Sequence, residues 1–175
     1  MIIRPAVDAD VPRVARIHVD AWRYAYRGLL PDATLAALSY ESCEELWFGV
    51  LAEGADSKRL FGIEPHRLFV ADRPDREVAG FVSCGPNRDP DGTHRGELAS
   101  LYLREDELGT GLGHALFEAA RTDLAERKLI PFVLWVLAGN DRAIRFYERH
   151  GGVAIPARAG VHRGVATCDL GFTFA

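Results

Sequence analysis

Three glycines alternate along the segment ELGTGLGH, at Gly109, Gly111 and Gly113, and an apolar helical pattern follows at once. Glycine weakens helices and loses much entropy on folding, so this placement needs a physical reason. The first turn of a helix leaves backbone N–H groups without partners, and the helix dipole adds partial positive charge there. Without side chains in the way, those amides can approach a phosphate closely. The segment therefore predicts an anion cradle at the start of a helix.

Three kinds of phosphate-binding loop compete for this pattern. A P-loop requires G-x-x-x-x-G-K-[ST], which the sequence lacks. The dinucleotide fingerprint G-x-G-x-x-G, counted from Gly109, has His114 at its last glycine position, and the segment lies past the middle of the chain. A nicotinamide enzyme of the Rossmann type is therefore the weaker alternative. A third pattern, [Q/R]-x-x-G-x-[G/A] after a strand, fits in its glycines.

Strands and helices that would position this loop can be read from the hydrophobic periodicity. Strands are expected at 2–4, 66–72, 78–85, 97–103 and 131–137, with one or two more after Val153, the clearest at 166–174. Helices are expected from about Val11 to Trp22, in two pieces between Pro31 and Gly54, and at 112–127 and 141–150. This order predicts an α/β fold with a mixed sheet, antiparallel at first and then continued through a strand–helix–strand crossover.

Composition excludes several classes of function. The chain has 21 basic and 25 acidic residues, a net charge of −4, which argues against a nucleic-acid partner. It has no apolar run of the ~18 residues that a membrane span needs. Cys43, Cys84 and Cys168 are scattered and odd in number, which favours reduced thiols in a cytoplasmic protein. No histidine pairs with a cysteine at metal-ligand spacing, so no metal site is expected.

The segment LYLREDELGTGLGHALFEAA resembles the acetyl-coenzyme A (acetyl-CoA) segment of the GNAT superfamily of N-acetyltransferases, a strand, pyrophosphate loop and helix. Further along, VLWVLAGNDRAIRFYERHGG resembles the strand, Asn, helix and Tyr that follow in that family, and DAWRYAYRGLLPDATLAAL resembles its acceptor-side helix pair. The resemblance spans nearly the whole chain in the family's order. It implies one domain over residues 1–175, with a mostly antiparallel sheet of about seven strands flanked by about four helices.

The resemblance also implies the residues that hold acetyl-CoA, which is a co-substrate. In the family, a strand offers backbone bonds to the arm of the cofactor, the glycine loop holds the pyrophosphate and an Asn binds the arm from the opposite side. Carried onto this sequence, these cofactor residues are Leu101, Tyr102, Leu103, Leu108, Gly109, Thr110, Gly111, Leu112, Gly113, Asn140, Arg142 and Tyr147. Leu108 departs from the family, which usually has Gln or Arg there, and Arg104 is a possible substitute contact. Asn140 could equally serve as a helix N-cap.

Acetyl transfer needs an acid and a base. An amine attacks a thioester only when neutral, so a base must take its proton, and the leaving thiolate must gain one. A phenol of pKa ~10 can protonate a thiolate whose acid has pKa ~8.5, and the family has such a Tyr at the position of Tyr147. The family often has a base where this chain has Glu97, although an exposed strand-end carboxylate is the plainer interpretation. Weaker alternatives for the base lie in the preceding loop: Asp89, Asp91 and His94.

The acceptor is expected to be a small-molecule or peptide amine, near Tyr26 and Arg27 in the break after the first helix. Direct attack in a ternary complex is expected, because no cysteine shows the supporting base of a covalent route. Family members often pair, so a homodimer is possible. A non-catalytic acyl-CoA sensor stays as the alternative function, since Leu108 and an uncertain base leave room for it.

Overall fold

The secondary structure follows the order that the periodicity predicts. The computed structural model describes residues 1–61, 65–74, 77–89 and 92–175. Its strands are β1 Ile2–Pro5, β2 Arg67–Asp72, β3 Val78–Pro86, β4 Gly96–Leu103, β5 Phe132–Leu137, β6 Val153–His162 and β7 Val165–Phe174. Its α-helices are α1 Val11–Ala25, α2 Asp32–Ala36, α3 Tyr40–Phe61, α4 Leu112–Glu126 and α5 Asp141–Arg149. Short 3-10 turns precede α1 at Asp8–Asp10 and follow β4 at Glu105–Glu107.

One seven-stranded sheet runs through the molecule in the order β1-β2-β3-β4-β5-β7-β6. All neighbouring pairs are antiparallel except β4 and β5, which run parallel. The predicted mixed, mostly antiparallel sheet is therefore confirmed. The described residues contain five α-helices where about four were expected, because the helical segment after Pro31 divides into the five-residue α2 and the long α3.

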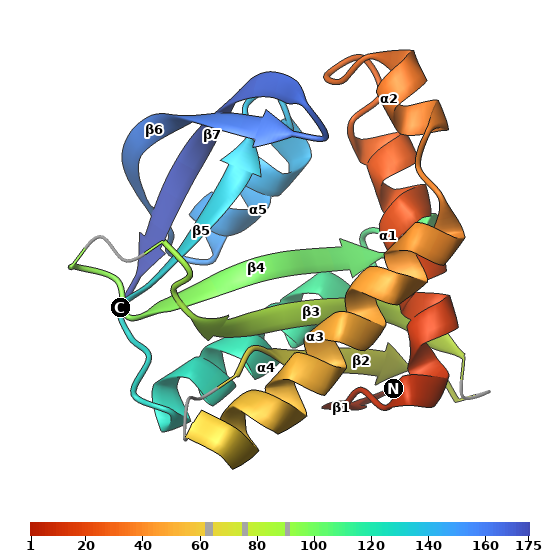
Figure 1. The fold of residues 1–175 in the computed structure, drawn as a ribbon. Coiled ribbons are helices and arrows are strands. Elements are labelled where there is room, and N and C mark those ends of the chain that lie inside the picture. The colour runs from red at the N-terminus through yellow and green to blue at the C-terminus, as the bar shows by residue number, and fades with distance from the viewer. Residues whose placement is uncertain (62–64, 75–76, 90–91) are drawn as a thin grey trace.

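The parallel pair β4–β5 is joined only at its start. Gly96 pairs with Phe132 and Glu97 pairs with Val133, and beyond these positions the two strands diverge. Figure 1 shows the resulting wedge, with β4 leading toward α1 and β5 turning up beside β7. Backbone N–H and C=O groups along this edge of β4 have no strand partner, so they are available to another extended chain.

At the closed end of the wedge there is no room for a side chain on β4. A Cβ atom added at Gly96 would collide with the backbone oxygen of Leu129 and crowd the side chain of Leu124. Glycine is therefore the residue that lets β4, β5 and the end of α4 meet at this point.

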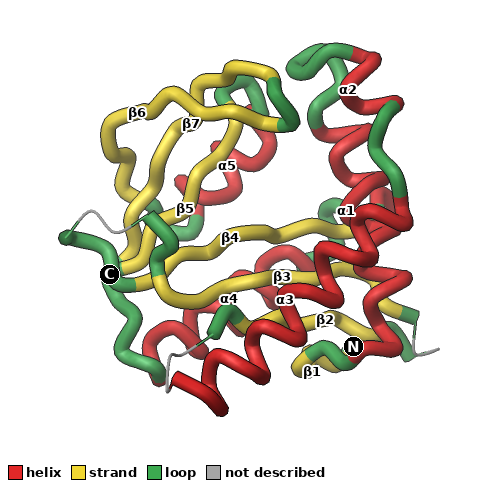
Figure 2. Tube along the Cα trace, viewed as in Figure 1, coloured by secondary structure: helices red, strands yellow, loops and turns green. Residues whose placement is uncertain are grey.

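Helices cover both faces of the sheet (Figures 1 and 2). On one face α1 and α3 pack over β2 and β3, in a core that includes Val14, Trp47 and Phe81. On the other face α4 and α5 pack in a core that includes Phe117 and Phe132. Full burial of a large apolar side chain contributes roughly 1.5–3 kcal/mol, so these two cores supply the main driving force for folding. None of the described helices combines the length and the apolar character that a membrane crossing requires.

A charged cluster fastens the N-terminal strand to its neighbours. The guanidinium of Arg4 donates to both carboxylate oxygens of Asp10, at 2.7 and 2.9 Å, and to Asp72 in β2, at 2.7 and 3.2 Å. Asp10 also accepts from the backbone N–H of Val7 at 2.9 Å. The hydrogen bonds from Arg4 hold the pKa of the Asp10 carboxyl below its usual range, although burial opposes them.

Candidate active site

A cavity of about 330 Å³ lies where β4 leaves the wedge and the glycine loop enters α4. Apart from Thr110 and Leu112, every residue predicted to hold the cofactor lines it. They come from three places: the end of β4 (Leu101, Tyr102, Leu103), the loop and start of α4 (Leu108, Gly109, Gly111, Gly113), and α5 with its preceding turn (Asn140, Arg142, Tyr147). The fold thus brings together segments that are up to about 45 residues apart in sequence, as a cofactor site requires.

The glycine loop presents bare backbone to the cavity. Gly109 and Gly111 have φ angles of 85° and 92°, in the left-handed region that side chains rarely adopt. A Cβ at either position would meet no atom within 4 Å, so the space beside them is open. The backbone N–H groups of Gly111 and Gly113 donate no hydrogen bond to any of the described residues. These features fit a cradle for a phosphate at the start of α4.

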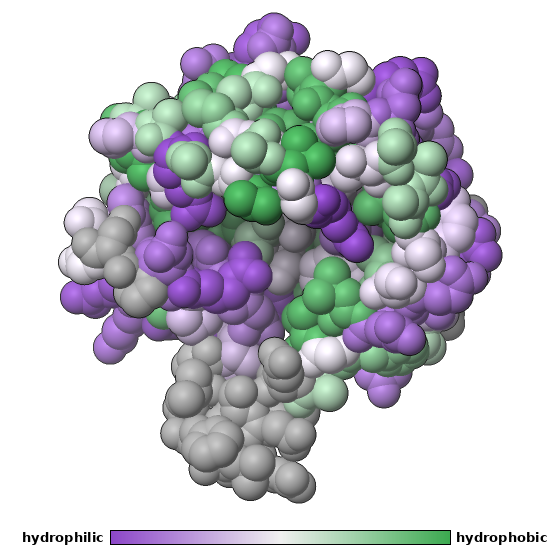
Figure 3. Space-filling view, turned by 45° about the horizontal axis from the view of Figure 1, so that its top comes forward, coloured by the Kyte–Doolittle hydropathy of each residue, from purple (hydrophilic) through white to green (hydrophobic). Residues whose placement is uncertain are grey.

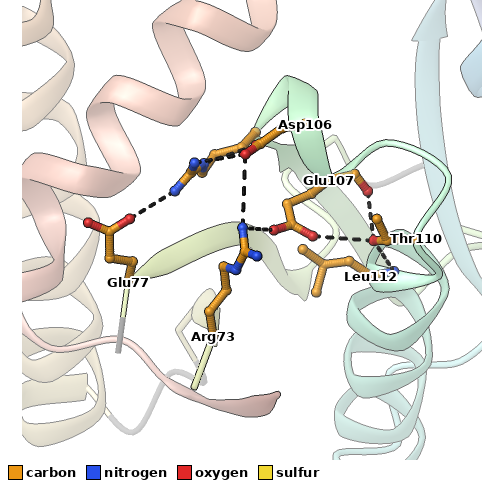
Figure 4. Close-up of polar contacts among 7 residues, drawn as sticks. Arg73, Glu77, Asp106, Glu107, Thr110 and Leu112 are labelled. Atoms are coloured by element: carbon orange, nitrogen blue, oxygen red, sulfur yellow. Dashed lines mark hydrogen bonds and ion pairs between the residues drawn. The ribbon is translucent and has the colours of Figure 1, made fainter. Parts of the chain in front are cut away.

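Thr110 and Leu112 stabilise the conformation of the loop and do not line the cavity. The Thr110 hydroxyl donates to the backbone oxygen of Glu107 at 2.8 Å and accepts from the N–H of Leu112 at 3.4 Å (Figure 4). Glu107 is buried and lies 2.8 Å from the guanidinium of Arg73. Both predicted cofactor residues therefore face away from the lining, and their contribution is to the conformation of the backbone between them.

Position 108 holds a leucine where the resemblance predicts Gln or Arg, and two observations show what takes its place. The side chain of Leu108 lines the cavity and packs against the core beneath α4. Arg104, the possible substitute, is engaged elsewhere, because it donates to Asp106 at 2.8 and 3.1 Å and to Glu77 at 3.0 Å. It is not among the described residues that line the cavity. The cradle therefore relies on backbone groups.

Asn140 caps α5 and also lies at the cavity. Its side-chain oxygen accepts from the backbone N–H of Ala143 at 3.3 Å, which makes it the N-cap of α5. It also lines the cavity, as does Arg142 two residues later. The cap fixes the first turn of α5 and so orients the helix that carries Tyr147.

Tyr147 is buried in the core beneath α4 and lines the cavity. Burial raises its pKa well above the ordinary phenol value, with a smaller contribution from Tyr102. Its hydroxyl therefore stays protonated at physiological pH and can act as a hydrogen-bond or proton donor. Phe146 also lines the cavity, and its ring lies within 4 Å of the place where a Cβ on Gly113 would stand.

Glu97 lies apart from this cavity, at the closed end of the wedge. Its carboxylate is buried, within 3.1 Å of the His66 ring, and accepts a hydrogen bond from Arg88. Burial alone would raise its pKa, but the hydrogen bonds from His66 and Arg88 outweigh burial and lower it. A carboxylate held in this way is a weak base, and it does not line the cavity that holds the predicted acid Tyr147.

The weaker candidates for the base are also distant from the cavity. Asp89 pairs with Arg158 at 3.0 Å, and a ring nitrogen of His94 lies 2.9 Å from the Thr173 hydroxyl. Asp91 lies outside the described residues.

Comparison with known proteins agrees with this geometry. Residues 22–152 match the model of the acetyltransferase (GNAT) family. An uncharacterized N-acetyltransferase of Bacillus subtilis, YuaI, is 31% identical over 148 residues, which cover 85% of this chain and 78% of the relative.

The chain belongs to the GNAT acetyltransferase family.

Solved structures share the fold over almost the whole length of this GNAT acetyltransferase. The ribosomal-protein-alanine N-acetyltransferase of Brucella melitensis is 25% identical, with a TM-score of 0.73 and 99% of both chains covered. The PaiA N-acetyltransferase of Thermoplasma acidophilum, crystallised with coenzyme A, is 15% identical, with a TM-score of 0.72 over 99% of this chain and 98% of its own.

On the opposite face of the wedge, aromatic side chains of this GNAT protein gather between α1 and β4. The hydroxyl of Tyr102 accepts from the indole N–H of Trp22 at 3.0 Å and lies 3.4 Å from the hydroxyl of Tyr26. Burial, and next the nearby Tyr102, raise the pKa of Tyr26 well above its usual value. In the space-filling view this face is hollowed in the middle, with hydrophobic and hydrophilic residues on the rim (Figure 3).

His18 supports this group from beneath. Its ring stacks on Tyr102 with centroids 5.1 Å apart, and its Nδ1 accepts from the indole N–H of Trp47 at 3.1 Å. Burial lowers the pKa of His18 to about 4, so this ring is neutral and structural.

The structure separates the two residues predicted to bind the acceptor. Tyr26 joins the aromatic group, whereas Arg27 lines a different depression on the outer side of α1, together with Arg23 and Arg104. The end of α1 thus presents Tyr26 to the wedge and turns Arg27 away from it.

Tyr24, His114 and His150 are among the residues that line the cofactor cavity without having been assigned from the sequence. Tyr24 donates to the backbone oxygen of Leu103 at 3.0 Å, which fixes the end of α1 to the end of β4, and burial raises its pKa to about 12. Nδ1 of His114 lies 2.9 Å from Nε2 of His150. The positions of both histidines could be read from the sequence, but the contact between α4 and α5 that brings them together could not. Within the described residues, no three His, Cys, Asp or Glu side chains are grouped to hold a metal ion.

Proposed function

We propose that this GNAT enzyme transfers the acetyl group of acetyl-CoA to a primary amine by direct attack within a ternary complex. The observation that supports this most is the placement of Tyr147, the unpaired edge of β4 and the open glycine cradle in one cavity. Each matches one part of the donor: its leaving sulfur, its amide-rich arm and its pyrophosphate.

In the proposal, backbone groups of Leu101 to Leu103 bind the arm as a neighbouring strand would, and the N–H groups of Gly111 and Gly113 bind the pyrophosphate. The cavity is lined mainly by the glycine loop, α4 and α5, whereas Trp22 and Tyr26 lie on the α1 side and do not line it; Tyr102 contacts both groups. The donor and the amine would therefore approach the reaction centre from opposite faces. Tyr147 would donate its proton to the sulfur as the C–S bond breaks.

The cysteines support direct attack over a covalent acetyl-enzyme. Burial raises the pKa of Cys43 to about 11 and that of Cys84 to about 12, so both thiols are poor nucleophiles. Cys168 is exposed, and none of the three lines the cavity.

The class of acceptor follows less directly. The Brucella neighbour is named for acetylating an alanine of a ribosomal protein, which supports a primary amine on a peptide as the first class to try.

The test is thiol release from acetyl-CoA, followed with a thiol-reactive chromophore, against a panel of peptides with free N-termini, lysine peptides and polyamines. Amine-dependent release, with acetylated product seen by mass spectrometry, is the expected result. Calorimetric binding of coenzyme A with no thiol release for any amine would instead favour a non-catalytic sensor. Thiol release would refute direct attack if it occurred as a stoichiometric burst without amine.

A further inference from the structure

The β6–β7 hairpin carries a histidine–aspartate pair on the α1 side of the sheet. Asp169 of β7 stands opposite Leu137 of β5, and Leu137 belongs to the core beneath α1. Directly opposed residues of a strand pair share a face, so Asp169 points toward α1 as well. Nε2 of His162, at the end of β6, lies 3.0 Å from Oδ1 of Asp169.

This pair has a defined protonation pattern. The side chain of Asp169 is 4% exposed and also accepts from the Thr167 hydroxyl at 3.2 Å. A carboxylate only accepts hydrogen bonds, so Nε2 of His162 must carry the proton. In the neutral ring the lone pair then resides on Nδ1. The same arrangement, a buried carboxylate that orients an imidazole, prepares a histidine to act as a base.

The ring of His162 lies beside the aromatic group of α1 and is partly exposed. The ring of His162 packs edge-on to Trp22, with centroids 6.1 Å apart, and its side chain is 34% exposed. Trp22 connects the histidine to the cofactor cavity, because its indole N–H donates at 3.0 Å to the hydroxyl of Tyr102, which lines that cavity. The imidazole therefore lies at the hollow between α1 and the hairpin, with one side open to solvent.

We propose that His162 is the general base of this enzyme and that Asp169 positions it; the inference rests on the proposed acetyl transfer. Nδ1 of His162 takes one proton from the acceptor ammonium, directly or through one water, and passes it to solvent. The neutral nitrogen forms a bond to the thioester carbonyl carbon, and the C–S bond breaks. The sulfur takes the phenolic proton of Tyr147. The second proton of the attacking nitrogen restores the phenol, so each turnover releases one proton, one amide and one thiol.

The charged neighbours of the pair include Arg158 and Arg163. On β6, Nε of Arg158 lies 4.0 Å from Asp169, while its guanidinium also stacks on Trp135 at 3.9 Å and pairs with Asp89 at 3.0 Å. Arg163 follows His162 in the hairpin turn, and Asp169 adds to the raised pKa of Tyr26. Arg158 is shared among three partners, so it leaves Asp169 able to hold the imidazole. Glu97, the base expected from the sequence, is instead engaged at the closed end of the wedge.

An activity-independent measurement tests the pair first. Nitrogen NMR of the full chain, with His162 assigned by comparison with His162→Gln, should show the neutral ring protonated at Nε2. In Asp169→Asn this tautomer preference should be lost or reduced. A ring protonated at Nδ1 in the wild type would overturn the inference, whatever the enzyme acetylates.

Kinetics tests the role itself, with an amine that the wild type accepts. His162→Ala should lower kcat/KM by about 10²-fold or more, the range for loss of a general base, and should remove the rise of kcat/KM with pH. Added imidazole should raise the kcat/KM of His162→Ala at least about tenfold and should have no such effect on the other proteins. Val161→Ala, on an exposed neighbour in the same strand, controls for disturbance of the hairpin.

The outcomes separate this inference from the proposed function. Wild-type turnover with unchanged kcat/KM and pH dependence in His162→Ala would refute the base and leave acetyl transfer standing. A pH dependence lost in Glu97→Gln but kept in His162→Gln would assign the base to Glu97. Coenzyme A binding by calorimetry should be equal in wild type and in all His162 variants, because His162 does not line the cofactor cavity.

Discussion

The substitution Gly111→Glu tests whether the glycine loop holds a diphosphate. Gly111 is the residue before α4, with φ at 92° and open space where a Cβ would stand. A glutamate there would put a carboxylate into the space assigned to the pyrophosphate. We expect coenzyme A affinity to fall sharply while the fold is kept.

Two magnitudes can be worked out for this change. A side chain in the left-handed region costs about 1–2 kcal/mol, which for a chain of this size lowers Tm by roughly 2–8 °C. Like unit charges about 4 Å apart repel by about 1 kcal/mol in bulk water and about 4 kcal/mol near a protein surface. Each 1.4 kcal/mol is a factor of ten, so Kd should rise by at least about 5-fold and up to about 10³-fold.

Gly164, in the β6–β7 turn, provides a matched control. Its φ is 80°, a Cβ there also meets no atom within 4 Å, and it does not line the cofactor cavity. Gly164→Glu should therefore show a similar loss of Tm with unchanged coenzyme A affinity. Calorimetric titration and thermal melts of both variants decide the matter, and equal Kd values for the two glutamate variants would refute the cradle.

Three further predictions concern the catalytic acid, a helix cap and the N-terminal charge cluster. Tyr147→Phe should lower kcat by about 10²-fold or more with coenzyme A affinity kept, and an unchanged kcat in steady-state assays would remove Tyr147 from the mechanism. Asn140→Ala should lower the free energy of unfolding in denaturant by about 1 kcal/mol, while Asn140→Ser should keep the cap. Weaker coenzyme A binding in Asn140→Ser would then show that the amide contacts the arm of the cofactor. Unchanged binding would leave Asn140 with the capping role only. The pKa of Asp10 is lowered in the folded state, so its stabilisation is present above the unfolded value of ~3.9 and is lost as pH falls through the folded pKa. Asp10→Asn should therefore cost about 1–3 kcal/mol at pH 7 and flatten the acid-side fall of the unfolding free energy, and parallel pH profiles for both proteins would contradict this.

The cofactor side of the site could be predicted because its signals are local. The spacing of Gly109, Gly111 and Gly113 before an apolar helix follows from the backbone chemistry of a helix start. The order of strands and helices, with a near-continuous apolar strand at 131–137, indicated where the sheet would be buried. Family resemblance then supplied Asn140 and Tyr147, which the structure places in the same cavity as the loop.

The acceptor side could not be predicted in the same way, because it depends on strand register. Glu97 starts the right strand, yet the pairing with Val133 places it at the closed end of the wedge, away from Tyr147. His162 and Asp169 meet only through the β6–β7 hairpin, whose register shifts between Ile155 and Arg158. One signal was available: Asp169 is the one charged residue in the strand ATCDLGFTF, and a buried charge is unusual unless it has a partner.

Gly96 bears on the width of the wedge between β4 and β5. Any larger residue there would press on the Leu129 carbonyl and the Leu124 side chain, and would push β4 away from the end of α4. Because β4 and β5 pair only at their first residues, the contact at this point influences the angle at which the two strands diverge. In the proposed complex, a position that touches neither substrate would thus influence the space left for the donor's arm, because Gly96 sets how closely β4 approaches the end of α4.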